Sequence, residues 1–190
     1  APFINGHPSF SEPGYNDLET KLALAAEIRR AGAPLSYATP VLFYIRPGLF
    51  AFCANHEYGF SGLDAAQISQ ASFHARAELH QQVRALRQLG GVWQNLAIVA
   101  TPSHIGVREG RRIHGLYRVT AEDLRLGQKH ADAICRVNFP VDIHSSNPTQ
   151  GKAYSTEGIH SQAYDIPLRA LIAREVSHLL MTGRCISGDF

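Results

Sequence analysis

The sequence is poor in cysteine and has no long apolar run. Its three cysteines, Cys53, Cys135 and Cys185, are far apart and form no C-x-x-C pair. Such a pattern argues against a disulfide framework and against a zinc ribbon, and it fits a reducing compartment. No stretch approaches the roughly 18 apolar residues that cross a bilayer, and the first residues do not resemble a signal peptide. We therefore expect a cytoplasmic protein without a membrane segment.

The chain also lacks a strong charge of either sign. Lysine and arginine number 18 against 16 acidic residues, which gives a formal net charge of +2. The basic residues are spread along the chain, so we expect no nucleic-acid partner. Apolar residues make up 45% of the 190 residues, which is ample for a buried core.

Three common catalytic fingerprints are missing. The sequence contains neither the G-x-G-x-x-G turn of dinucleotide-binding folds nor a G-x-S-x-G nucleophile elbow. Among its ten histidines, His56-Glu57 comes nearest to the H-E-x-x-H motif, but Phe60 stands in the place of the second histidine. Later histidines share no helical face with a carboxylate at ligand spacing. We expect no metal site, and a histidine-based metalloenzyme is the least favoured interpretation.

Apolar periodicity predicts three helices. The first begins after a cap at Asn16 or Asp17 and stops at Gly32. The longest begins at Ser61 or Asp64 and ends at the glycine pair 90–91. A short helix begins near Thr120, three residues before Asp123, which is the spacing of a capping box. The polar face of the longest helix is expected at the surface, and it carries Gln70, His74, Glu78, Gln81 and Arg84.

Stretches rich in β-branched and aromatic residues predict strands. Residues 41–46 and 49–54, on either side of Pro47-Gly48, predict a hairpin. Further strand-like stretches are 93–100, 104–119, 139–144, 164–167 and 177–183, and the rest of 136–163 reads as loop. Strands and helices do not alternate strictly, so we predict an α+β fold with a mixed or antiparallel sheet and flanking helices.

The densest polar cluster spans residues 108–112. If this segment is a strand, Arg108 and Arg112 lie on one face with Gly110 between them. Two guanidiniums beside a glycine suit a carboxylate or the electron-rich edge of a flavin. A solvent-exposed edge strand with a Glu-Arg pair explains the same spacing, so both interpretations stay open.

Two smaller candidates follow. Asp142 and His144 lie on the same side of a predicted strand, where the carboxylate can hold one imidazole tautomer. The same pattern also fits a strand end that enters a polar loop. Cys185 lies in a glycine-flanked turn, where the alternative to a reactive thiol is a buried, inert one.

Three phrases in order resemble a known family. They are GVREGRRIHGLYRVTAEDL, HADAICRVNFPVDIH and YDIPLRALIAREVSHLLMTGRCIS. They resemble the FAD-dependent oxidoreductases of the broad glutathione-reductase-like class. Members of that class often carry R-E-x-R-R-I, P-I-D-I-H, Y-D-I-P-Y-R and N-L-L-V-A-G-R-C-I-S in this order. The close likeness covers residues 82–190, and residues before it are similar only in general layout.

The resemblance implies two parts and a set of site residues. Residues 1–104 are expected to form a substrate or cap domain, and residues 105–190 to return to a discontinuous FAD-binding domain. The match implies contact with the flavin or the substrate for Arg108 and Arg112, which together with His144 are the candidate catalytic residues, and contact with FAD for Gly183, Arg184 and Cys185. Asp142 matches the aspartate of the D-I-H phrase. Gly110 and Leu168 depart from the family, which usually has serine or threonine and an aromatic residue there.

The resemblance also implies partners. Because the family's glycine fingerprint and its closing helix are missing, the chain is expected to be part of a flavoenzyme that transfers hydride to or from a small organic substrate. The remaining FAD-domain segments, or a second chain that carries them, are then required, and the chain alone should bind FAD weakly or not at all. The alternative is a stand-alone binding or interaction module without redox activity. Such a module must cover the apolar run 177–183 with its own residues, whereas a fragment leaves it exposed.

Overall fold

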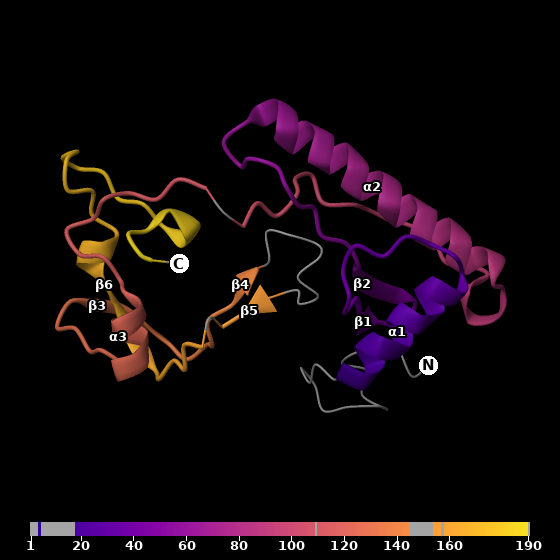
Figure 1. Ribbon diagram of the computed structural model, residues 1–190, viewed down its shortest axis with the longest axis horizontal. Coiled ribbons are helices and arrows are strands. Elements are labelled where there is room, and N and C mark those ends of the chain that lie inside the picture. Colours follow the sequence, from indigo (N-terminus) through magenta and orange to yellow (C-terminus); the bar gives the residue numbers. More distant parts are fainter. Residues whose placement is uncertain (1–3, 5–17, 109, 145–153, 157, 190) are drawn as a thin grey trace. The chain divides into compact units, whose positions relative to one another are not determined.

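The computed structural model describes two units of the chain (Figure 1). It covers residues 4, 18–108, 110–144, 154–156 and 158–189. Among these, the first unit holds 4, 18–60 and 64–105, and the second holds 61–63, 106–108, 110–144, 154–156 and 158–189. Helices occur together with antiparallel sheets of two strands each, which confirms the α+β prediction. The substrate-side role of residues 1–104 and the FAD-domain role of residues 105–190 stay predictions.

The elements of the first unit follow the sequence pattern closely. They are α1 (Leu18–Arg30), β1 (Val41–Arg46), β2 (Leu49–Cys53), α2 (Ala65–Gln88) and the 3-10 turn η1 (Gly91–Trp93). Strands β1 and β2 form the predicted antiparallel hairpin. The carboxylate of Asp64 accepts hydrogen bonds from the backbone of Ala66 and Gln67, so this residue is the N-terminal cap of α2. The predicted caps Asn16 and Asp17 lie outside the described residues.

The core of the first unit lies where α1, β1 and α2 meet. Its buried members are Leu24, Ile28, Leu42, Leu86 and Trp93. The indole nitrogen of Trp93 donates to Glu27 Oε2 at 2.9 Å, which satisfies the polar atom of an otherwise buried ring. None of the helices among the described residues combines the length and the apolar character that a membrane span requires.

The second unit contains short elements joined by long irregular segments. They are α3 (Ala121–Leu126), β3 (Ala133–Val137), β4 (Ile143–His144), β5 (Tyr154–Ser155), β6 (Tyr164–Pro167), η3 (Leu168–Ala170) and η4 (Gly183–Cys185). Strand β6 and the capping box of Thr120 and Asp123 confirm their predictions. Strand β3, which pairs with β6, was not predicted. The buried core of the second unit consists of Val119, Leu124, Val141, Ile159, Ala170 and Leu171.

Three predicted strands are wrong in the described residues. Residues 93–100 begin in η1 and continue as irregular chain, and residues 104–119 and 177–183 take part only in isolated bridges. These bridges join Gly115 to Ala173, Val119 to Gly188 and Ile172 to Leu180. The preference of β-branched and aromatic residues for strands arises from their packing on a pleated sheet. A segment with no continuous neighbouring strand lacks that surface and therefore does not form a strand.

Gly115 is closely packed against other segments of the second unit, and a substitution there tests this packing. A Cβ at this position would lie 2.7 Å from Ser187 Cβ and 2.9 Å from the carbonyl oxygen of Tyr117. We expect Gly115→Ala to lower the free energy of unfolding by about 1–3 kcal/mol, because the buried neighbours must shift. Urea unfolding followed by circular dichroism measures this change.

Gly106→Ala is the matched control. A Cβ there meets no atom within 4 Å. Its effect on the free energy of unfolding should stay within about 0.5 kcal/mol. Equal unfolding energies for the two variants would contradict the close packing at Gly115.

Candidate functional site

The six predicted site residues lie in the second unit, on three separate segments. Arg108 and Arg112 lie on the irregular segment before α3, His144 ends β4, and Gly183, Arg184 and Cys185 form η4. Because the arginine segment is not a strand at its described residues, the alternation of a strand does not place the two arginines. The surroundings of each arginine are therefore given by its hydrogen bonds and ion pairs.

Arg112 lies beside the turn that was predicted to contact FAD. The backbone nitrogen of Ile113 donates to the carbonyl of Cys185 at 3.1 Å. The guanidinium of Arg112 reaches the carbonyl of Gly188 at 3.4 Å. The structure thus brings together one predicted arginine and the predicted flavin-side turn, which are about seventy positions apart in the sequence.

Further backbone hydrogen bonds extend this contact on both sides. Val119 donates to the carbonyl of Ser187 at 3.1 Å, and Asp189 donates back to the carbonyl of Val119 at 2.9 Å. On the other side, Ser187 donates to the carbonyl of Ala170 at 2.9 Å. The segment 185–189 is therefore fixed between the chain before α3 and the end of η3.

The glycine of η4 has room around it. Gly183 has a φ of 62°, a left-handed conformation that favours glycine, and a Cβ there would meet no atom within 4 Å. Arg184 is exposed, and Cys185 is a free, partly exposed thiol. This turn has the open backbone that close approach of a ligand requires.

Arg108 has a different partner from Arg112. Its Nη2 atom lies 3.4 Å from Asp142 Oδ2, and both side chains are partly exposed. An ion pair of this length in contact with water contributes little to stability. It does bring the arginine segment next to the predicted D-x-H phrase. The side chain of His144 lies outside the described part, so its pairing with Asp142 stays a prediction.

A cluster around Tyr117 was missed in the sequence. The Tyr117 hydroxyl donates to Asp123 Oδ1 at 2.8 Å, and the Arg169 guanidinium lies 5.2 Å from the centre of the tyrosine ring. Arg169 also forms a two-pronged ion pair with Asp132. Burial, followed by the hydrogen bond to Asp123, raises the pKa of Tyr117 to about 12. The tyrosine is thereby kept as a neutral hydrogen-bond donor that connects α3 to the segment before it.

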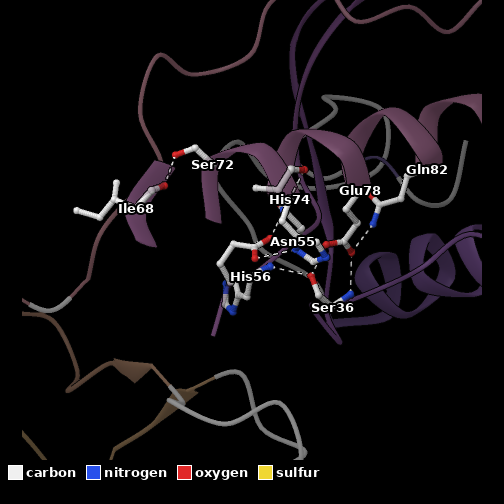
Figure 2. A network of polar contacts seen from close by, with 10 residues as sticks. Ser36, Asn55, His56, Ile68, Ser72, His74, Glu78 and Gln82 are labelled. Atoms are coloured by element: carbon white, nitrogen blue, oxygen red, sulfur yellow. Dashed lines mark hydrogen bonds and ion pairs between the residues drawn. The ribbon is translucent and has the colours of Figure 1, made fainter. Parts of the chain in front are cut away.

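The first unit contains a polar network that was also missed (Figure 2). Both carboxylate oxygens of Glu78 are used, because Ser36 donates its backbone nitrogen at 2.9 Å and its hydroxyl at 2.8 Å. The amide of Gln82 donates to the same carboxylate at 3.0 Å, and the backbone nitrogen of His56 donates to the Ser36 hydroxyl at 2.9 Å. The network ties two loops to α2.

The prediction that Glu78 faces solvent is wrong. The exposed fraction is 5% for Glu78 and 0% for Gln82. The two side chains belong to the buried stripe of α2, which includes Ala71, Ala75 and Leu86. Spacing by three and four residues was the signal that could have found them. Their polar character hid it. The hydrogen bonds to the Glu78 carboxylate and from the Gln82 amide nitrogen offset the cost of burial, although Gln82 Oε1 has no hydrogen-bond partner among the described residues.

A second branch of the network surrounds the His56-Glu57 pair. The Nδ1 atom of His74 lies 2.8 Å from Glu57 Oε2, and Asn55 donates to Glu57 Oε1 at 3.4 Å. The His56 ring stacks on Tyr37 with ring centres 4.1 Å apart. Among the described residues, no group of three histidine, cysteine or acidic side chains is placed to hold a metal ion. The side chains of this branch hold one another by hydrogen bonds and ring stacking.

A family model described as FAD dependent oxidoreductase matches residues 12–190. No curated protein and no solved structure matches the chain.

Glu78→Gln tests the network in the first unit. The new amide group places a nitrogen donor where one carboxylate oxygen accepts, so at least one buried donor loses its partner. We expect the free energy of unfolding to fall by about 1–3 kcal/mol in urea titrations.

Glu175→Gln serves as the control, since its side chain is 73% exposed. It should change the free energy of unfolding by no more than about 0.5 kcal/mol. If both variants unfold alike, Glu78 does not organise these loops.

Tyr117 gives the second unit a pH signature. Its folded-state pKa of about 12 lies above the ordinary value of 10.0, so folding favours the protonated phenol. The stability this provides is fully present below pH 10 and is lost as the pH rises towards 12. We expect Tyr117→Phe to flatten the decline in the free energy of unfolding between these two pH values. An unchanged decline would show that the Tyr117 phenol is not held by burial and Asp123.

Proposed function

This chain belongs to the family of FAD dependent oxidoreductases, whose model matches residues 12–190, and from that premise we propose a role for it. The chain supplies the substrate-side domain and the flavin-contacting segments of an enzyme that transfers hydride between FAD and a small organic substrate. The enzyme is of the glutathione-reductase-like class and acts in the cytoplasm. Three free cysteines fit a reducing compartment.

The meeting of residues 112–113 with residues 185–188 is the observation that carries the proposal. These segments match separate phrases of the family, and the hydrogen bond between Ile113 and Cys185 makes them neighbours. The open backbone at Gly183 and the exposed side chain of Arg184 fit a turn that approaches a flavin. The residues of this turn therefore suit one side of the cofactor.

The residues have distinct proposed roles in the reaction. FAD, when bound, accepts or supplies the hydride. Arg108 and Arg112 orient the substrate and stabilise negative charge that develops on it. His144 holds or moves the proton of the substrate's hydroxyl or amine group. Gly183, Arg184 and Cys185 position the flavin side of the site.

The diphosphate of FAD requires groups that this chain does not supply. Dinucleotide folds bind the diphosphate at a G-x-G-x-x-G turn and the following helix N-terminus, and the sequence contains no such turn. We infer that a further FAD-domain segment, or a second chain that carries it, completes the site. Leu179 and Leu180 support this inference, because 38% and 55% of their surfaces are exposed. An autonomous module without redox activity has no reason to leave this run uncovered.

Flavin binding provides the test. The purified chain should carry no stoichiometric flavin and should lose added FAD on gel filtration, because no turn anchors the diphosphate. Co-expression with an FAD-domain segment of the family that carries the G-x-G-x-x-G turn should give a yellow complex of equal stoichiometry. Tight yellow flavin in the chain alone, or a colourless complex, would contradict the proposal.

A pair of glycine variants sharpens the test. Gly183 and Gly48 both have a left-handed φ and open surroundings, so alanine introduces similar backbone strain at either position. Gly183→Ala should weaken flavin binding in the complex, whereas Gly48→Ala should not. Equal flavin affinity in the two variants would remove η4 from the proposed site.

A further inference from the structure

The first unit has an open groove between α2 and the chain that follows it. The groove measures about 700 Å³ and lies between residues 80–88 and 94–98. The Nη2 atom of Arg76 donates to the carbonyls of Pro102 and Ser103 at 2.9 Å and 3.2 Å. These hydrogen bonds attach the chain that follows residues 94–98 to α2. They help to hold residues 94–98, which form the second wall of the groove, in place.

The groove is positively charged. His80, Arg84 and Arg87 line it at i, i+4 and i+7, which places them on one face of α2. No acidic residue is among the lining side chains. In the described part of the chain, Arg136 and Arg169 face carboxylates, whereas no carboxylate contacts Arg84 or Arg87. Their charge is therefore available to a ligand.

The spacing of the two arginines suits a ligand with two charges. Residues three apart on a helix have Cβ atoms roughly 5–6 Å apart, so the guanidiniums can contact neighbouring but separate anionic groups. Between and beside them the walls are apolar, since Val83, Ala97 and Ile98 also line the groove. A guanidinium binds carboxylate or phosphate oxygens in pairs, and the apolar wall accommodates a short carbon chain.

We propose that this groove binds a small dianionic ligand. Arg84 and Arg87 each bind one oxyanion group, Gln94 donates an amide hydrogen bond, and Val83 and Ile98 pack against the atoms between the charges. A dicarboxylate and a diphosphate share this chemistry. The apolar walls favour the dicarboxylate. The site uses none of the residues proposed to contact the flavin. The proposal of a dianion site is therefore independent of the proposed flavin site.

Titration calorimetry of the full chain tests the site. Glutarate, pyrophosphate and acetate are the probes, at low ionic strength because exposed charges are screened by salt. We expect saturable one-to-one binding of glutarate, with acetate at least about tenfold weaker because it occupies only one guanidinium. Arg84→Gln/Arg87→Gln should weaken glutarate binding by roughly tenfold or more.

A second double variant controls for net charge. Arg29→Gln/Arg46→Gln removes the same two charges from positions outside the groove. It should change glutarate affinity by less than about twofold, while both double variants keep the circular dichroism spectrum of the native chain.

Each outcome decides the proposal. Binding of pyrophosphate but not glutarate keeps the dianion site and assigns it to diphosphates. Absence of saturable binding for both dianions overturns it. It is also overturned if acetate binds as tightly as glutarate, or if the two double variants lose affinity equally.

Discussion

Backbone hydrogen bonds between two distant segments hold the second unit together. Residues 113–119 exchange hydrogen bonds with residues 185–189, and Ser187 is bonded in turn to Ala170. Among the described residues, each sheet has two strands, so these hydrogen bonds rather than a wide sheet join the segments. Gly115 permits the close approach, because any larger residue there would meet Ser187 and two backbone oxygens. This contact makes Arg112 and η4 neighbours.

This contact also shows which of the segments that resemble the family lie together in the folded chain. The family match extends over residues 12–190 without revealing which segments meet. The structure joins the arginine phrase to the terminal turn through Cys185 and Gly188, and to the D-x-H phrase through Asp142. The proposed flavin site follows from these contacts. The groove on α2 is a separate site, because its positive charge comes from one helix face in the other unit.

The sequence predicted what local interactions determine. Helix α2 and its Asp64 cap, the capping box at Thr120 and the hairpin at residues 41–53 each depend on a few neighbouring residues. Strands need partners from elsewhere in the chain, so residues 93–100 and 177–183 kept strand-like composition without strand pairing. The site contacts also depend on tertiary structure and could not be predicted from spacing. Spacing placed Arg108 and Arg112 on one strand face, whereas in the folded chain Arg108 contacts Asp142 and Arg112 contacts Gly188. Glu78 was missed because its charge outweighed its position in the apolar stripe.

We propose that the turn at residues 183–188 faces a flavin. Hydrogen–deuterium exchange of the flavin-loaded complex, compared with the same complex after flavin removal, tests it most directly. We expect the amides of residues 183–188 and 110–113 to exchange more slowly when flavin is bound, while those of α2 do not change. Unchanged exchange at residues 183–188, with protection elsewhere in the chain, would contradict it.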